Sequence, residues 1–338
     1  MIPLNKLNTS ILELIGNTPM IEMNIKHENE IWHVYTKLEF MNPTGSVKDR
    51  IAKYIIEQAE KRGELKPDSI VVEATSGNTG IGLSMVCAVK GYKLIIVMPE
   101  HMSLERRKIM TMLGAEICLT PVEELFEGAV ERTRKMAAQN PKIFLTRQFE
   151  NLDNIDCHYK TTGVEILQQM EGEKIDAFVA GIGTAGTLMG VAKRLRETYP
   201  DCKLIAVEPK EAAMLMGCTN PGTHEIAGIG DGFIPQLVDM KQISWPDAIL
   251  GCDAINMART ICNSYGMMVG VSSGANALAA INVLKKIGKD KTVVTVFPDR
   301  SERYFSTDLY QGKKDEIVRC CRKGCECPFC HLKVNLTD

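Results

Sequence analysis

Residues 69–91 read S-I-V-V-E-A-T-S-G-N-T-G-I-G-L-S-M-V-C-A-V-K-G, and this stretch decides the fold class. Ser69–Ala74 is a short segment rich in Val and Ile that predicts a strand. Asn78–Lys90 predicts a helix that ends at Gly91. A strand without polar alternation is typical of a sheet whose two faces are both covered by helices, as in parallel sheets. The stretch therefore predicts a strand–loop–helix unit of an α/β fold.

The same alternation continues along most of the chain. Further strands are expected at Lys93–Met98, Glu116–Thr120, Lys142–Thr146, Asp176–Ala180, Lys203–Val207, Met267–Val271 and Thr292–Phe297. Helices are expected at Val47–Arg62, Ser103–Leu113, Glu123–Ala138, Cys157–Met170, Thr187–Glu197, Asp253–Ser264 and Ala275–Ile287. Residues 1–40 form strand-like pieces without a matching helix, and residues 210–250 are irregular. This order predicts an α/β fold with mostly parallel sheets.

Length and composition narrow the function classes. The 338 residues suggest two domains at about 100–200 residues each. The 40 basic and 42 acidic residues give a net charge of −2, which argues against nucleic acid or an anionic membrane as the main partner. The sequence has no apolar segment that predicts a signal peptide or a membrane span. We therefore expect a soluble cytoplasmic protein, in which the seven scattered cysteines are small buried hydrophobic residues.

Four unusual loops follow predicted strands, where ligands bind in open parallel sheets. They are Thr75–Gly80, Gly181–Thr187, Ser272–Ala275 and Pro298–Arg303. The first three are rich in Gly, Ser and Thr and lie where a helix begins, so free N–H groups and the helix dipole favour an anion. Several such loops at one edge indicate a ligand with more than one negative group.

The loop Gly181–Thr187 allows two functional interpretations. Its Gly183–Thr187 part resembles a phosphate-binding loop, because glycines let the backbone approach a phosphate and two Thr hydroxyls add donors. The same loop also spells G-x-G-x-x-G, with Glu208 located 22 residues after Gly186, which is the fingerprint of an NAD-binding oxidoreductase. A tight turn without a ligand is the third possibility.

Lys48 lies in the first turn of the predicted helix Val47–Arg62. The positive end of the helix dipole would lower the pKa of a lysine there and favour its use as an amine nucleophile. A lysine exposed to solvent is the alternative at this position.

Several motifs together resemble one enzyme family. They are Leu14–Pro19, Pro43–Arg50, Thr75–Gly80, Met98–Ser103, Gly183–Thr187, Val271–Gly274 and Glu302–Thr307. Their order and spacing resemble the cysteine synthase (O-acetylserine sulfhydrylase) and cystathionine β-synthase family, which are fold-type II pyridoxal-phosphate enzymes. The resemblance covers about residues 9–312. It ranks above the oxidoreductase interpretation, which gives Lys48 and Ser272 no role, and above a catalytically silent scaffold protein.

The resemblance implies a fold and an assembly. It implies two α/β domains, each a mostly parallel twisted sheet flanked by helices, with the cofactor in the cleft between them. The N-terminal domain would span residues 41–155, and the C-terminal domain residues 1–40 and 156–312. It also implies a homodimer that acts on a small amino-acid substrate.

The resemblance also implies roles for individual residues. Lys48 would hold pyridoxal 5'-phosphate covalently and, once displaced, would remove the α-proton. Asn78 would bond the ring hydroxyl oxygen and Ser272 the pyridine nitrogen. The cofactor phosphate would be bound by Gly183, Thr184, Ala185, Gly186 and Thr187. The substrate carboxylate would be bound by Thr75, Ser76, Thr79 and Gln148.

These residue types favour one reaction class. A serine at the pyridine nitrogen stabilises positive charge there less than a carboxylate would, so a long-lived carbanion is disfavoured. Loss of a β-substituent is then the easier course, and addition of a nucleophile completes a β-replacement. The implied activity is that of a cysteine synthase, which converts O-acetylserine and sulfide to cysteine.

Two positions depart from the family pattern. Ala185 stands where the phosphate loop more often has Gly. Asp231 stands where cysteine synthases usually have a small apolar residue. A carboxylate would repel anionic sulfide, but it could act as a base toward water or a thiol. Asp231 therefore raises an alternative, the replacement of the sulfur of cysteine to give serine, lanthionine or cystathionine with release of hydrogen sulfide. An exposed aspartate in a turn is the functionally neutral interpretation.

The C-terminal segment 313–338 lies outside the resemblance. Its cysteines have ligand-type spacing at Cys320, Cys321, Cys325, Cys327 and Cys330. Such spacing predicts a zinc site or an iron–sulfur cluster, and a redox-labile tail is the alternative.

Overall fold

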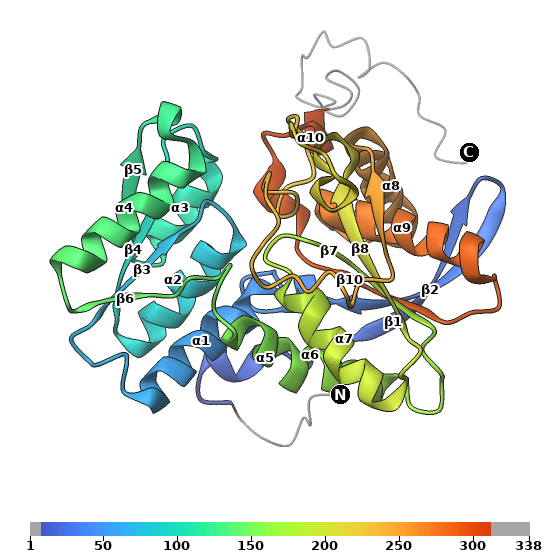
Figure 1. The fold of residues 1–338 in the computed structure, drawn as a ribbon, viewed down its shortest axis with the longest axis horizontal. Coiled ribbons are helices and arrows are strands. Elements are labelled where there is room, and N and C mark those ends of the chain that lie inside the picture. The colour runs from blue at the N-terminus through green and yellow to red at the C-terminus, as the bar shows by residue number, and fades with distance from the viewer. Residues whose placement is uncertain (1–7, 312–338) are drawn as a thin grey trace, which may run out of the picture.

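The computed structural model describes residues 8–311, and they form two sheets with helices on both sides (Figure 1). The four-stranded sheet has the order β5-β4-β3-β6 with parallel neighbours. Its strands are β3 (Ile70–Ala74), β4 (Lys93–Pro99), β5 (Glu116–Thr120) and β6 (Ile143–Leu145). Helices α2 (Asn78–Lys90), α3 (Leu104–Met112) and α4 (Leu125–Gln139) lie with this sheet.

The six-stranded sheet has the order β1-β2-β10-β7-β8-β9. Its strands are β1 (Met20–His27), β2 (Glu30–Leu38), β7 (Ala177–Gly181), β8 (Lys203–Pro209), β9 (Trp245–Ile249) and β10 (Val293–Phe297). Only the β1–β2 hairpin is antiparallel in this sheet. Its helices are α6 (Thr162–Gln169), α7 (Gly186–Thr198), α8 (Gly251–Tyr265), α9 (Val271–Ile287) and the short α10 (Asp308–Gln311). The two-sheet α/β fold expected from the sequence is confirmed, whereas the domain boundaries at residues 41 and 155 stay a prediction.

The central strands are buried on both faces, as their apolar runs predict. All five residues of β10 are buried, and four of the five in β3 are buried. Most predicted elements agree with the structure within a few residues. One strand was missed: β9 contains Pro246 and pairs only with β8, and an edge strand tolerates a proline because one side needs no hydrogen bond.

Two predicted elements differ from the structure. The strand predicted at Met267–Val271 is wrong, because only Val269 forms an isolated bridge and helix α9 already begins at Val271. An apolar run of five residues cannot distinguish the two states. The helix predicted at Cys157–Met170 is two helices, α5 (Asp153–Lys160) and α6, separated at Thr161. The Thr161 hydroxyl donates a hydrogen bond to the carbonyl of Cys157 at 2.7 Å, a local bond of the kind that bends helices.

A buried ion cluster fixes the helix that precedes the four-stranded sheet, α1 (Lys48–Arg62). The guanidinium of Arg50 contacts Glu39 at 2.7 Å and Glu165 at 2.6 Å, and Lys37 contacts Glu165 at 2.8 Å. All four residues are buried. Because Glu39 follows β2 and Glu165 lies on α6, the cluster ties the start of α1 to the six-stranded sheet and its helices. Charge-assisted pairs of this kind specify geometry closely.

The seven described cysteines are only partly the buried residues that we expected. All are free thiols, but only Cys87, Cys157 and Cys202 are buried, and Cys252 is exposed. The spacing of these cysteines along the sequence does not indicate which of them are buried. Within residues 8–311, no helix has the length and apolar character needed to cross a membrane.

Candidate functional site

One cavity of about 220 Å³ lies where the loops of the two sheets meet. It contains the ends of β7 and β10 and the starts of α1, α2, α7 and α9. Every residue that the sequence analysis assigned to cofactor, substrate or catalysis within the described chain lines it: Lys48, Thr75, Ser76, Asn78, Thr79, Gln148, Gly183, Thr184, Ala185, Gly186, Thr187, Asp231 and Ser272. The structure thus brings these residues together, and their individual roles stay predictions.

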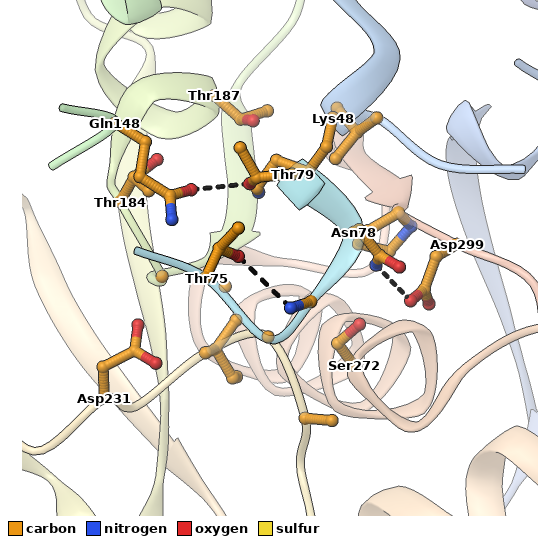
Figure 2. A pocket seen from close by; sticks show the side chains of 18 of the residues that line it. Lys48, Thr75, Asn78, Thr79, Gln148, Thr184, Thr187, Asp231, Ser272 and Asp299 are labelled. Atoms are coloured by element: carbon orange, nitrogen blue, oxygen red, sulfur yellow. Dashed lines mark hydrogen bonds between the residues drawn. The ribbon is translucent and has the colours of Figure 1, made fainter. Parts of the chain in front are cut away.

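Lys48 is the first residue of α1 and points its amine into the cavity (Figure 2). Burial lowers the pKa of the Lys48 amine, and the charges of Asp231 and Asp299 oppose this effect. The position of Lys48 at a helix start predicts a lowered pKa through the helix dipole, but loss of hydration is the main cause. A lysine with a lowered pKa carries the free amine more often, which an amine nucleophile requires.

Asn78 and Ser272 lie at the starts of two different helices and face the same cavity (Figure 2). Asn78 is the first residue of α2, and Ser272 is the second residue of α9. The first residues of both helices have backbone N–H groups without a partner in their own helix, so both starts favour acceptor atoms. Asn78 provides an amide and Ser272 a hydroxyl, which suit an oxygen and a neutral ring nitrogen.

The loop Gly183–Thr187 forms a cradle before α7. A Cβ at Gly183 would lie 2.4 Å from the carbonyl oxygen of Gly228, so only glycine fits there. Ala185 adopts the left-handed conformation with φ of 69°, which a glycine would adopt without strain. Thr187 contacts the buried His158 at 3.1 Å, and burial lowers the pKa of His158 to about 3, so this imidazole is neutral at physiological pH.

Hydrogen bonds hold three of the predicted carboxylate-binding residues, Thr75, Thr79 and Gln148. The Thr79 hydroxyl donates to the Gln148 side chain at 2.6 Å, and the Gly77 N–H donates to the Thr75 hydroxyl at 3.2 Å (Figure 2). Gln148 is in turn supported by Glu73, whose carboxylate accepts from the Gln148 N–H at 3.3 Å. The loop therefore holds several donors in a fixed arrangement, as recognition of a carboxylate requires.

Asp231 lies across the cavity from Lys48 (Figure 2). It is accessible from the cavity, while its neighbours Gly230 and Gly232 adopt positive φ values of 72° and 81°. The surrounding protein reduces the hydration of this carboxyl and raises its pKa, and the charges of Lys48 and His224 oppose the shift. The glycines thus shape a loop that turns Asp231 toward the cavity.

Sequence reasoning missed four residues that support the site. Asn154 donates to the carbonyl of Gln148 and to the Thr184 hydroxyl, both at 2.9 Å, and so connects the two loops. Asp299 and Arg303, from the segment after β10, bond the Asn78 side chain, and Tyr304 donates to Asp299. The loop Pro298–Arg303 was noted because it follows the last strand, and that position was the available signal. Asn154 lies inside a helix and gave none.

These residues fit pyridoxal phosphate. A glycine-dependent cradle at a helix start suits the phosphate, an amine with a lowered pKa suits the aldehyde, and neutral donors at two helix starts suit the ring. In addition, the buried Oδ1 atom of Asp299 lacks a hydrogen-bond partner within the described residues. The dinucleotide interpretation has less support, because the carboxylate of Glu208 already accepts a hydrogen bond from the N–H of Leu215 at 2.8 Å.

The predicted metal site lies outside the described residues; its cysteines are Cys320, Cys321, Cys325, Cys327 and Cys330. Within residues 8–311, no group of three or more His, Cys, Asp or Glu side chains is arranged to hold a metal ion.

Comparison with known proteins also indicates pyridoxal phosphate as the cofactor. The family model described as "Pyridoxal-phosphate dependent enzyme" matches residues 11–299. A cysteine synthase of Staphylococcus aureus is 46% identical over 301 residues, which cover 89% of this chain and 96% of that protein. The crystal structure of a cysteine synthase from Entamoeba histolytica is 42% identical with a TM-score of 0.87 and covers 94% of both chains. A hydrogen sulfide-producing enzyme from Fusobacterium nucleatum is 40% identical with a TM-score of 0.86, covering 90% of this chain and 92% of that one.

Proposed function

The chain belongs to the family of pyridoxal-phosphate dependent enzymes, and from this premise we propose how its cavity carries out a cysteine synthase-like β-replacement. The substrate is a 3-substituted L-alanine, and the cysteine synthase form of the reaction joins O-acetylserine and sulfide to give cysteine and acetate. One observation supports this assignment above all others: Lys48, the Gly183–Thr187 cradle, Ser272 and the Thr75–Thr79 loop line a single cavity.

Each side chain then has a defined task. The cofactor, when bound, acts as an electron sink that acidifies the α-hydrogen of the substrate. The amine of Lys48 takes that proton from the α-carbon, because its lowered pKa leaves it free of a proton more often. Thr75, Thr79 and Gln148 hold the substrate carboxylate and so keep the α-hydrogen in reach of Lys48.

The neutral donor Ser272 disfavours competing reactions. A hydroxyl beside the ring nitrogen stabilises positive charge there less than a carboxylate would. Negative charge on the α-carbon is therefore short-lived, which favours departure of the β-substituent over racemisation or transamination.

The test of this proposal is spectroscopic. The purified protein should absorb visible light through a cofactor bound to Lys48, and borohydride should bleach this band. Lys48→Ala should be folded, by an unchanged circular dichroism spectrum, and should lack the band. A wild-type protein without a visible band, or a Lys48→Ala variant that shows the same borohydride-sensitive band, would contradict the assignment.

Asp231 favours a second form of the reaction, in which the sulfur of cysteine is replaced. Water or a neutral thiol must lose a proton as it attacks, and the carboxylate of Asp231 faces the cavity with a pKa that reduced hydration raises above its ordinary value. With water, cysteine would give serine and hydrogen sulfide; with a thiol such as homocysteine it would give cystathionine and hydrogen sulfide. The similarity to a hydrogen sulfide-producing enzyme supports this form.

A product screen separates the two forms. Asp231→Asn should lower sulfide release from cysteine plus water by about 100-fold, the usual effect of losing a general base. Synthesis of cysteine from O-acetylserine and sulfide should change little, because ionised sulfide needs no base. Asp239→Asn, an exposed aspartate after the same loop, is the matched control. Unchanged release of sulfide and serine by Asp231→Asn would exclude the base role.

Location and assembly are further parts of the proposal. We infer a cytoplasmic homodimer. The seven free thiols within residues 8–311 suit a reducing compartment, and the resemblance to cysteine synthases supports a dimer. Cell fractionation and analytical ultracentrifugation test the two statements separately.

A further inference from the structure

The side-chain amide of Asn78 is held at both ends by residues that none of the steps above uses. Its Nδ2 atom donates to Oδ2 of Asp299 at 2.6 Å (Figure 2). Its Oδ1 atom accepts a hydrogen bond from the guanidinium of Arg303. A carboxylate only accepts and a guanidinium only donates, so only one of the two amide orientations satisfies both partners. Because Asp299 uses one of the two Nδ2 hydrogens, the other is available to a ligand in the cavity.

The same segment also holds the chain that leads into Lys48. Arg303 donates a second bond to the carbonyl of Thr44 at 2.6 Å. The Val47 N–H donates to the carbonyl of Pro298 at 2.8 Å. Gly45 has a φ of 85°, and a Cβ there would come within 2.9 Å of Arg303. Residues 298–303 therefore fix Asn78 and the start of α1 against one common support.

Asp299 itself is a buried and only partly bonded carboxylate. It is 1% exposed, and its Oδ2 atom also accepts from the Tyr304 hydroxyl. Burial and the charge of Asp299 raise the pKa of Tyr304, so this hydroxyl keeps its proton and remains a donor. The Oδ1 atom has no partner within the described residues and lies so close to Gly270 that a Cβ there would be 2.2 Å away. Burying such an atom is costly, and atoms of this kind cluster at functional sites.

We propose that Asp299 and Arg303 are positioning residues that lock the Asn78 amide with its N–H donor turned toward the ring oxygen of the cofactor. The inference rests on the proposed cofactor role of Asn78. In this arrangement Asp299 and Arg303 act through Asn78, and the lock keeps the donor end of the amide in place. A locked donor stabilises the negatively charged form of the ring oxygen, which controls how the bound cofactor absorbs light.

The test uses the intact enzyme and two variants. Asp299→Asn makes one partner of the amide able to donate as well as accept, and Arg303→Lys replaces the two guanidinium nitrogens that bond Asn78 and Thr44 with a single ammonium nitrogen. Asp247→Asn is the matched control, because Asp247 also accepts from an asparagine side chain, Asn282, at 3.0 Å, but outside the cavity. Two quantities are measured at one pH: the cofactor concentration for half-saturation of the apoenzyme, and the ratio of visible to near-ultraviolet absorbance of the bound cofactor.

Both site variants should raise the half-saturation concentration by about tenfold and lower the absorbance ratio at saturation. Asp247→Asn should stay within about twofold of the wild type on both measures, so a general loss of stability cannot explain the result. If Asp299→Asn does not fold, Arg303→Lys carries the test, because it leaves the buried carboxylate with its Tyr304 donor. Site variants with wild-type absorbance ratios would overturn the inference. A wild type without any Lys48-dependent absorbance would instead overturn the proposed function and this inference with it.

Discussion

Replacement of Glu73 by glutamine should stabilise the protein at pH 8 much more than at pH 5. Glu73 lies in β3, is 5% exposed, and its carboxylate accepts hydrogen bonds from the Thr146 hydroxyl and the Gln148 N–H. No Lys, Arg or His side chain within residues 8–311 forms an ion pair with it. Burial therefore raises the pKa of Glu73 from 4.5 to about 7, and the hydrogen bonds only partly oppose this rise.

The size of the effect follows from proton linkage. Between pH 4.5 and about 7 the folded protein keeps the proton of Glu73, whereas the unfolded chain has lost it. The unfolded state thus binds fewer protons, and the free energy of unfolding falls as pH rises through this window. A shift of one pKa unit corresponds to about 1.4 kcal/mol, so the contribution of Glu73 should fall by about 2.5 kcal/mol between pH 5 and pH 8. Glutamine does not titrate, and its side-chain oxygen can accept both bonds.

The assay is urea unfolding of wild type and Glu73→Gln at both pH values, followed by circular dichroism. The stability gain of the variant should be about 2.5 kcal/mol larger at pH 8 than at pH 5. Groups unchanged by the substitution cancel in this comparison. Glu123→Gln, at an exposed position, controls for the loss of one negative charge. An equal gain or loss at the two pH values would refute the argument that burial alone keeps Glu73 protonated.

Three further predictions concern the buried ion cluster and the loop Gly183–Thr187. Glu165→Gln should lower the free energy of unfolding by about 3–5 kcal/mol at both pH 5 and pH 8, because it breaks the buried pair with Arg50. The pKa of Glu165 is lowered to about 2, so its stabilisation is lost only as the pH falls from about 4.5 to about 2. Urea unfolding at the two pH values measures this. Gly183→Ala should weaken cofactor binding by at least about tenfold, since its Cβ would meet the carbonyl of Gly228; apoenzyme titration measures this, and wild-type affinity would contradict the close approach. Ala185→Gly should stabilise the protein by about 1 kcal/mol and so raise the thermal midpoint, because glycine adopts the positive φ without strain. Calorimetry measures this, and an unchanged midpoint would show that Ala185 is not strained.

Local pattern was enough to predict most of the fold and the part of the site that lies in loops. The strands around β3 are continuous apolar runs, and Gly183 and Lys48 stand at helix starts, where the signal is contained in a few neighbouring residues. The supporting contacts are of another kind. Asn78 and Asp299 are separated by 221 positions, and only the pairing of two distant segments brings them together. Val269 was placed in a strand for a local reason, because a short apolar run does not distinguish a strand from the start of a helix.

The strand order of the larger sheet has a consequence for how the chain folds during synthesis. β10 lies between β2 and β7, and within residues 8–311 it is the last strand to be made. At about 5–20 residues per second, the hairpin that ends at Leu38 waits between about 10 and 50 seconds for Val293 to emerge. The smaller sheet, complete at Leu145, has all its strands long before then. Among the described residues, the nascent chain therefore has every strand of its four-stranded sheet early, and it completes the six-stranded sheet only when β10 is made.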